Sequence, residues 1–343
     1  MIVCVAIVHR TQWPNRAASG GEQRVLVTGC AGFLGSHLSE RLVEHGHTVL
    51  GVDCFAPYYP REIKERNLER VRDDPRFALV ELDLATEALE GLMEGVDTVF
   101  HLAAQPGVVG SFGASFEIYA RNNVLATQRL LEAAANASPV AFVYASSSSV
   151  YGNASRYPTT ELTPRKPLSP YGLTKVATEE LAAVYMRCFG VPVIGLRYFT
   201  AYGPRQRPDM AFSKFFRCAL SGRALPINGE GRQVRDFTFV DDIVAGTLAA
   251  AERGRPGRIY NIGGGSPVEL CDAIAWIGEL TGRDIELDRR PAPVGEAQRT
   301  GCDGALARRE LGFVPRTGVY EGLVAQLEWM RGEGQRHVAT VAA

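Results

Sequence analysis

Short apolar runs rich in β-branched residues alternate with longer, more polar segments along most of the chain. The first run, RVLVTG, is followed by SHLSERLVEHG, in which apolar residues recur at helical spacing. Such alternation is typical of a parallel sheet flanked by helices, so the pattern predicts an α/β fold. The apolar runs cover residues 24–29, 48–53, 98–104, 141–147, 191–198 and 258–264.

Two stretches rich in Gly, Pro and Arg interrupt this alternation in the second half of the chain. Because 343 residues exceed what one hydrophobic core usually organises, we expect these stretches to form a smaller domain beside the main one. The N-terminal segment is expected to be a disordered tail, or to precede the true translation start. The predicted boundaries are 24–199 plus 238–263 for the main domain, 200–237 plus 264–335 for the smaller domain, and 1–23 and 336–343 for the tails.

The composition argues against long-range attraction to nucleic acid or to an anionic membrane. There are 37 basic and 38 acidic residues, which give a formal net charge of −1. The seven cysteines form neither a CxxC pair nor a Cys/His cluster, so we expect a reduced, cytoplasmic protein without a structural zinc. The N-terminal apolar run stops at His9, and charges interrupt every other stretch before it reaches membrane length. We therefore expect no nucleic acid, no membrane and no metal as partners.

The first apolar run leads into a glycine-rich loop, VTGCAGFLGS, at the start of a predicted helix. Gly29, Gly32 and Gly35 lack side chains, so the backbone can turn sharply and approach a pyrophosphate at the N-terminus of that helix. Spaced glycines can also serve only to pack a helix on a strand. Asp53, which ends the second run, favours the dinucleotide interpretation, because its carboxylate can accept hydrogen bonds from ribose hydroxyls and repel a 2′-phosphate. The pattern predicts NAD, in preference to NADP.

A tyrosine and a lysine, Tyr171 and Lys175, follow the serine-rich end of a later run, in SPYGLTKVATEEL. Because they are four positions apart, they share one face of a helix. A pair at this spacing is common on exposed helices and carries little information alone. A phenol titrates at about pH 10, and an adjacent ammonium stabilises its phenolate. The pair could therefore remove a hydroxyl proton near neutral pH.

These motifs occur in the order found in the extended short-chain dehydrogenase/reductases, within the NAD-dependent epimerase/dehydratase family, which the chain resembles from about Arg24 to beyond Gly312. The resemblance rests on TGxxGxxG, Asp83-Leu84, HLAA and YGLTK. It implies an NAD-dependent enzyme with a Rossmann-type doubly wound parallel sheet and a smaller C-terminal substrate-binding α/β domain. The cofactor contacts that it implies are Gly29, Gly32, Phe33, Leu34, Gly35, Asp53, Asp83, Leu84, Leu102, Ala103, Ala104, Asn123, Tyr171, Lys175 and Tyr198.

The resemblance also implies a course for catalysis. Tyr171 would act as the general base for the C4 hydroxyl of a sugar, and Lys175 and the positive nicotinamide would stabilise its phenolate. Lys175 would also hold the nicotinamide ribose, while Ser147 would hydrogen-bond the same sugar oxygen as Tyr171. NAD⁺ would accept the C4 hydride, so that a transient 4-keto sugar forms in the site.

Within the family, the chain most resembles UDP-glucuronate 4-epimerases. The segments that carry this resemblance are DCFAPYYPREIKERNLE, HLAAQPGV, the serine run and RYFTAYGPRQRPDM. It implies a UDP-uronate whose carboxylate lies among short hydroxyl side chains and near Arg207, with Arg235 on the diphosphate. One departure is Val109, where related uronate epimerases usually carry arginine. The substrate contacts that it implies are Pro106, Gly107, Ser147, Ser148, Ser149, Thr200, Arg207, Ile227 and Arg235.

Other activities stay open at this point. UDP-glucuronate decarboxylases generally carry Glu at the position of Ser149, and dTDP-glucose dehydratases carry an Asp-Glu pair at Ser148 and Ser149, so serines there disfavour decarboxylation and, more strongly, dehydration. A UDP-glucose-type 4-epimerase is a further alternative, although that class generally carries Asn at the position of Thr200. The intact catalytic residues disfavour a non-catalytic NAD sensor. The leading hypothesis is a UDP-uronate 4-epimerase that converts UDP-glucuronate to UDP-galacturonate without net NADH formation.

The resemblance finally implies a homodimer, joined by the helices that carry Asn123 and Tyr171. The segment YARNNVLATQRLLEAA has an amphipathic pattern that is compatible with this arrangement. The same apolar stripe could instead face the sheet, so the pattern alone does not decide the oligomeric state.

Overall fold

A seven-stranded parallel sheet forms the core of the main domain in the computed structural model, which describes residues 21–89 and 91–341, with 333–341 described by their backbone alone. The strand order is β10-β6-β5-β4-β1-β2-β3, so the direction of chain progression reverses between β1 and β4. Its strands are β1 (Arg24–Thr28), β2 (Thr48–Asp53), β3 (Phe77–Glu81), β4 (Thr98–His101), β5 (Ala141–Ser147), β6 (Val193–Tyr198) and β10 (Ile259–Ile262).

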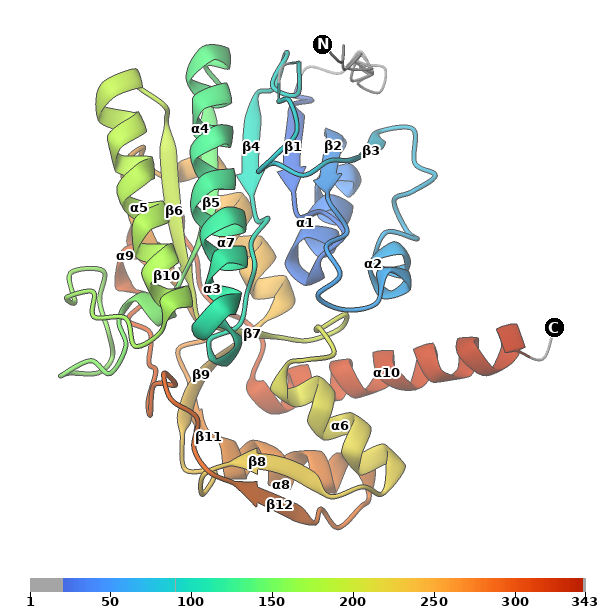
Figure 1. Ribbon diagram of the computed structural model, residues 1–343. Helices are drawn as coiled ribbons and strands as arrows, with labels where there is room; N and C mark the ends of the chain where they lie inside the picture. The colour runs from blue at the N-terminus through green and yellow to red at the C-terminus, as the bar shows by residue number, and fades with distance from the viewer. Residues whose placement is uncertain (1–20, 90, 342–343) are drawn as a thin grey trace.

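Helices cover both faces of this sheet (Figure 1). Successive residues of β1 point to opposite faces: Leu26 packs with the cluster under α4 and α5, whereas Val25 and Val27 pack with the cluster that includes α7. A strand buried on both faces needs an almost continuous apolar run, which is the pattern that the sequence displays. The Rossmann-type doubly wound sheet predicted from the sequence is therefore confirmed. The helices of this domain are α1 (Phe33–Glu44), α2 (Arg61–Asn67), α3 (Phe116–Tyr119), η3 (Ala120–Leu125), α4 (Ala126–Ala137), α5 (Pro170–Phe189), α7 (Val240–Arg253) and α9 (Ala305–Leu311), with short turns η1 (Val109–Ser111), η2 (Gly113–Ser115) and η4 (Ser148–Val150).

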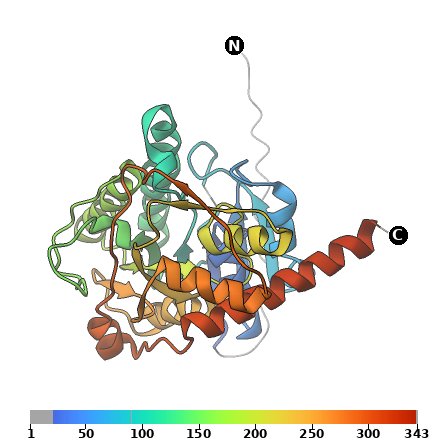
Figure 2. The same ribbon diagram turned by 90° about the horizontal axis from the view of Figure 1, so that it is seen from below.

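A smaller domain lies below the carboxyl ends of the main sheet in Figure 1. It contains a three-stranded sheet of order β11-β9-β7 and a two-stranded parallel sheet of β12 and β8, and Figure 2 shows α6, α8 and α10 lying across it. Aromatic rings fill its core, where Tyr202 contacts Phe212 and Phe239 edge to face. Its elements are β7 (Thr200–Tyr202), α6 (Ala211–Ser221), β8 (Leu225–Asn228), β9 (Val234–Phe239), β11 (Pro267–Glu269), α8 (Leu270–Thr281), β12 (Leu287–Arg290) and α10 (Val319–Val341).

Some elements differ from the sequence-based expectations. The strand β3 was not among the predicted runs, because this edge strand alternates between buried and exposed residues and lacks a continuous apolar stretch. Residues 1–20 of the predicted tail lie outside the described residues, but Gln23 is not part of a tail: its carbonyl accepts a hydrogen bond from Thr48 N–H at 3.0 Å. The helix α10 passes the predicted boundary at 335, and α9, from the segment assigned to the smaller domain, packs on α7 and β10.

Within the part of the chain that the structure describes, no helix is long and apolar enough to cross a membrane. In the same residues, no group of three or more His, Cys, Asp or Glu side chains is placed so that it could hold a metal ion. The cysteines that the structure describes are free thiols: Cys30, Cys54, Cys188, Cys218, Cys271 and Cys302.

Candidate active site

A cleft opens at the carboxyl ends of the parallel strands, beside the point between β1 and β4 where the strand order reverses. Ligand sites of open α/β sheets form at this position, outside the strand ends. The loops after β1, β2, β4, β5 and β6 and the first turns of α1 and α5 contribute its walls. The predicted site residues that line the cleft are Gly29, Gly32, Phe33, Leu34, Gly35, Asp53, Asp83, Leu84, Leu102, Ala103, Ala104, Pro106, Ser147, Tyr171, Lys175, Tyr198 and Arg207.

The glycine-rich loop closes one end of the cleft at the N-terminus of α1. A Cβ on Gly29, whose φ is +73°, would lie 2.8 Å from the backbone nitrogen of Ala103, and a Cβ on Gly35 would lie 2.0 Å from the carbonyl oxygen of Gly29. Gly32 N-caps α1, whose first turn has no acidic residue and no side-chain cap. The positive end of α1 therefore faces the cleft with its first turn free of acidic residues, which fits the pyrophosphate of a dinucleotide.

Asp53 lies at the end of β2 with only 8% of its surface exposed. Its Oδ2 accepts a hydrogen bond from the backbone N–H of Ala31 at 3.1 Å, and its Oδ1 accepts one from that of Phe55 at 2.8 Å. Since each carboxylate oxygen has two acceptor positions, capacity is left for ribose hydroxyls. The ammonium of Lys64 lies 3.6 Å from Oδ1 and also lines the cleft. Lys64 was not predicted, because a lysine within a polar helical segment carries no local signal.

Asn123 is the one predicted cofactor residue that does not line the cleft. Its side chain is buried and bonded within the protein: Oδ1 accepts from Gln105 N–H at 2.7 Å, and Nδ2 donates to Gln105 O and to Thr174 Oγ1, each at 3.0 Å. It therefore ties the loop after β4 to α5, behind the cleft wall. Asp83 and Leu84, predicted to contact the adenine, line the cleft.

The candidate catalytic residues come from two elements that meet at the cleft. Ser169 caps the N-terminus of α5 and so presents Tyr171 in its first turn, whereas Ser147 ends β5. Lys175 lies one turn further along α5, where its Nζ donates to the carbonyl of Ala145 at 2.8 Å. The three predicted residues thus line one cleft around the same point.

Burial dominates the protonation of this cluster. It raises the pKa of Tyr171 above its ordinary value, while a hydrogen bond with Ser147 and the charge of Arg207 act in the opposite direction. Burial lowers the pKa of Lys175 to about 8, against the opposing charge of Glu179. Lys175 was expected to lower the pKa of Tyr171; the groups that oppose the effect of burial are instead Ser147 and Arg207.

The part of the cleft that Arg207 lines contains an ion pair and an aromatic side chain. The guanidinium of Arg207 donates two hydrogen bonds of 3.0 Å to the carboxylate of Asp209 and lies 5.8 Å from the centre of the Tyr58 ring. Tyr58 in turn donates to Asp209 at 3.2 Å. Tyr58, like Met210 and Gln105, lines the cleft without having been predicted. The segment that carries Tyr58 was noted in the sequence, but nothing local distinguishes this residue.

The remaining predicted substrate residues do not line the cleft. Ser148 and Ser149 follow Ser147 in η4, and Ser149 Oγ accepts a hydrogen bond from Ser147 Oγ at 3.1 Å. Ile227 is buried in the core of the smaller domain, so it packs against protein and not against the cleft. The residues that lie outside the cleft lining are Gly107, Ser148, Ser149, Thr200, Ile227 and Arg235.

Comparisons with known proteins agree with this geometry. A family model described as the NAD dependent epimerase/dehydratase family matches residues 25–263. A Bacillus subtilis (strain 168) relative named uncharacterized UDP-glucose epimerase YtcB is 42% identical over 311 residues, which are 90% of this chain and 98% of the relative. A Rhizobium meliloti (strain 1021) relative named probable UDP-glucuronate 4-epimerase is 34% identical over 342 residues, which are 93% of this chain and 100% of the relative.

A solved structure supports the same assignment. UDP-glucuronic acid 4-epimerase from Bacillus cereus, in complex with UDP-glucuronic acid and NAD, superimposes with a TM-score of 0.88 at 38% identity, covering 90% of this chain and 99% of its own. The family match includes the glycine-rich loop, the end of β5 and the start of α5. The chain therefore belongs to the NAD-dependent epimerase/dehydratase family, within the extended short-chain dehydrogenase/reductases.

Proposed function

We propose that the chain is an NAD-dependent UDP-sugar 4-epimerase that interconverts UDP-glucuronate and UDP-galacturonate through a transient 4-keto intermediate. The observation that carries this proposal is the convergence of Ser147, Tyr171 and Lys175 in one cleft with Arg207. The relatives support it, since the Rhizobium meliloti protein and the Bacillus cereus structure both carry the name of a UDP-glucuronate 4-epimerase.

The side chains of the cleft have separate tasks in this reaction. Bound NAD supplies the hydride acceptor and, in its reduced form, the hydride donor at C4 of the sugar. Tyr171 would remove the proton of the C4 hydroxyl and later return it to the same oxygen, which Ser147 would hold by a hydrogen bond. Lys175 contributes a positive charge that favours the phenolate and a donor for the nicotinamide ribose. The glycine-rich loop and Asp53 would hold the pyrophosphate and the adenosine ribose.

The serines that follow Ser147 bear on the outcome at the 4-keto stage. Oxidation of a uronate at C4 creates a β-keto acid, which loses CO₂ when its carboxylate bond stands perpendicular to the ketone. An epimerase must hold the carboxylate out of that alignment. Ser148 and Ser149 lie outside the cleft lining, and their hydroxyls cannot act as the acid and base of a water elimination. The cation of Arg207, close enough to influence Tyr171, suits the same carboxylate.

A neutral UDP-sugar is the second candidate substrate. Val109, at the position where related uronate epimerases usually carry arginine, is 48% exposed and does not line the cleft. This residue cannot supply a positive charge to a uronate carboxylate. The Bacillus subtilis relative, which is named as a UDP-glucose epimerase, supports the same alternative.

Incubation of the purified protein with UDP-glucuronate tests the proposal. We expect UDP-galacturonate by NMR and mass analysis, with no net NADH absorbance and no CO₂. Release of CO₂ as the main outcome would identify a decarboxylase instead. Faster conversion of UDP-glucose than of UDP-glucuronate would favour the neutral substrate.

Replacement of the proposed base provides the matched variant for that experiment. Tyr171→Phe removes only the phenolic oxygen, so we expect turnover to fall by at least about 100-fold while NAD still binds. Tyr185→Phe makes the same chemical change further along α5, where the hydroxyl contacts Gln128 and Glu132 away from the cleft. Equal losses in the two variants would argue against a catalytic role for Tyr171.

We also propose that two copies of the chain pair through α4 and α5. The support is a set of exposed apolar side chains on α5 and on α3 and η3, the helical segments that lead into α4. Exposed apolar patches on a folded domain mark interaction surfaces, and a self-complementary pair of helices suits a two-fold dimer. The side chains are Phe116, Ile118, Leu125, Leu173, Val184 and Phe189.

We further propose a cytoplasmic location. The thiols that the structure describes are all unpaired, and a set of free cysteines is typical of proteins in reducing compartments. Fractionation of the native host cells, with immunodetection of the protein, tests this location.

A further inference from the structure

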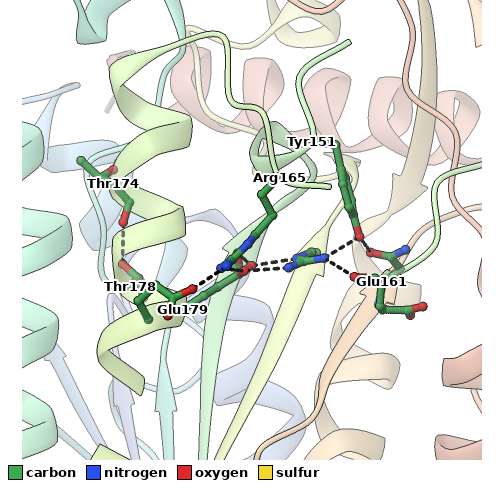
Figure 3. Close-up of polar contacts among 10 residues, drawn as sticks. Tyr151, Glu161, Arg165, Thr174, Thr178 and Glu179 are labelled. Carbon is green, nitrogen blue, oxygen red and sulfur yellow. Dashed lines mark hydrogen bonds and ion pairs between the residues drawn. The ribbon is translucent and has the colours of Figure 1, made fainter. Parts of the chain in front are cut away.

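A buried carboxylate, Glu179, lies on α5 two turns after Tyr171 and one turn after Lys175. Residues four apart share a helix face, so Glu179 belongs to the same face as the candidate catalytic pair. Its side chain is 1% exposed. Figure 3 shows it pointing from α5 into a polar network that includes Arg165 and, through Arg197, reaches Tyr151 and the backbone of Glu161. A carboxylate buried away from water must be compensated by hydrogen bonds and a positive charge.

Side chains from three other segments donate to this carboxylate. Arg197, on β6, donates from Nε to Oε1 at 2.8 Å and from Nη2 to Oε2 at 2.7 Å. Ser146, on β5, donates to Oε1 at 2.6 Å, and Arg165 donates to Oε2 at 3.2 Å. Both carboxylate oxygens are therefore satisfied. The bidentate geometry of Arg197 fixes the direction of the carboxylate as well as its charge.

Two of these donors are the immediate neighbours of site residues. Ser146 precedes Ser147 on β5, and Arg197 precedes Tyr198 on β6. Lys175 bonds to the carbonyl of the residue before Ser146. One carboxylate thus ties together the three elements that present the catalytic serine, the tyrosine and lysine, and the residue at the nicotinamide end of the cleft.

Stability alone does not account for such an ion pair. Well-packed apolar residues of similar volume often stabilise a fold as well as a buried ion pair does, because the pair must first lose its hydration. Arg197 is held further by bonds from Nη1 to Tyr151 Oη at 2.9 Å and to the carbonyl of Glu161 at 3.1 Å. What an ion pair offers in addition is a single fixed geometry.

We propose that Glu179, paired with Arg197, is a positioning residue that fixes Ser147 and Lys175 in register with Tyr171. The inference rests on the proposed epimerase function. Glu179 does not line the cleft and acts through its neighbours, so its loss should impair turnover more than binding. A displacement of a catalytic group by about 1 Å can slow a reaction by about 100-fold.

The charge of Glu179 also acts on Lys175. The ionisable groups around Lys175 are Tyr171 and Glu179 on its own helix and His101 on β4. Burial, with a contribution from Lys175, lowers the pKa of His101 to about 3, so His101 is neutral. Glu179 is the group that raises the pKa of Lys175 against the effect of burial. Without this carboxylate, Lys175 loses its proton at lower pH.

The test compares Glu179→Gln with Glu180→Gln in the full-length, NAD-loaded protein. Glutamine keeps the shape of Glu179 and removes its charge, so we expect kcat for UDP-glucuronate to fall by at least about tenfold, with KM changed by less than about threefold. The alkaline limb of the kcat profile should move to lower pH. Glu180→Gln makes the same chemical change at the adjacent, exposed residue, which also pairs with Arg165. It should leave kcat and the alkaline limb of the pH profile unchanged.

A second variant guards against misfolding, because glutamine leaves Arg197 without its counterion. Glu179→Met with Arg197→Met removes both charges, and thermal unfolding and the NAD dissociation constant check its fold. It should remain folded, bind NAD and show the same loss of kcat. Wild-type kcat and an unshifted alkaline limb in either folded variant would overturn the inference.

Failure of the proposed function gives a different result. If the unmodified protein does not convert UDP-glucuronate, the uronate assignment is wrong, and the same variants are compared on UDP-glucose, the second candidate substrate. The positioning role is overturned only when a substrate that the unmodified protein converts is converted equally well by the folded variants.

Discussion

Lys175 keeps a charge in a wall of the cleft that is almost closed to water, with 4% of its surface exposed. Burial lowers its pKa from 10.5 to about 8, so near neutral pH the folded protein holds a proton against the effect of its surroundings. The unfolded chain holds the same proton without this cost. The folded state is therefore destabilised by Lys175 below about pH 8, and the penalty disappears as pH rises toward 10.5.

We expect Lys175→Met to lose turnover and to gain stability near neutral pH. The lowered pKa corresponds to roughly 3 kcal/mol, of which the lost hydrogen bond to Ala145 removes about 1 kcal/mol, so the free energy of unfolding should rise by roughly 2 kcal/mol. Denaturant unfolding at a series of pH values measures this, and the gain should shrink as pH rises. Lys214→Met, at an exposed position on α6, is the control and should show no such dependence. A destabilised Lys175→Met protein would contradict the expectation.

The residues of the candidate site differ in how far the sequence could predict them. Ser147, Tyr171 and Lys175 belong to short motifs, one at the end of a strand and one within a single helix. All three line the cleft. Asn123 shares a motif too, but a hydrogen-bond partner on α5 turns its amide away from the cleft. Lys64 could not have been found, because its pairing with Asp53 depends on how α2 packs beside β2.

At the scale of elements, the end of β1 and the start of α1 approach each other closely in the loop that joins them. A Cβ on Gly35 would meet only backbone atoms, the nearest at 2.0 Å. Backbone of this kind cannot move aside without separating the loop from α1. The N–H groups that α1 presents to the cleft would move with it.

We expect Gly35→Ala to weaken NAD binding by at least about tenfold and to lower stability by about 1–3 kcal/mol, as overpacking in a fixed core does. Isothermal titration with NAD and thermal unfolding measure the two effects. Gly304→Ala is the matched control, because a Cβ there has nothing within 4 Å and the backbone φ is −93°. NAD affinity equal to that of the unmodified protein would show that the loop tolerates the added methyl group.

The elements that the sequence predicted are those with a strong local period. Strands buried on both faces were recognised as continuous apolar runs, whereas β3 was not, since it lies at the edge of the sheet and exposes alternate residues. The packing of α9 on α7 could not be read from α9 itself, a seven-residue helix whose buried residues Ala307 and Leu311 fit either domain.

At the scale of the whole molecule, the smaller domain lies below the carboxyl ends of the main sheet, as Figure 1 shows. Arg235 and Ile227 lie in the smaller domain, apart from the cleft lining. The outer surface of α5 carries apolar side chains that the single chain leaves exposed, among them Leu173 and Val184. A second copy would cover them.

We expect Val184→Glu to convert a dimer into a monomer, because a carboxylate buried between two helices without a partner is costly. Light scattering should give twice the chain mass of 37.3 kDa for the unmodified protein and 37.3 kDa for the variant. Leu162→Glu adds the same charge at a residue that is 93% exposed in the loop before α5, and should leave the mass unchanged. A single-chain mass for the unmodified protein would contradict the proposed dimer.

The sequence by itself determined the sheet of parallel strands, the dinucleotide loop with Asp53, and the Ser147, Tyr171 and Lys175 set, because each depends on the period or spacing of residues within one or two adjacent elements. Only the tertiary structure decided which distant side chains meet: Lys64 with Asp53, Arg207 near Tyr171, and Arg197 with Glu179. The two members of each pair lie on separate segments of the sequence, at no regular spacing. Their formation is fixed by how layers pack and by the need to satisfy buried charges, which no local pattern records.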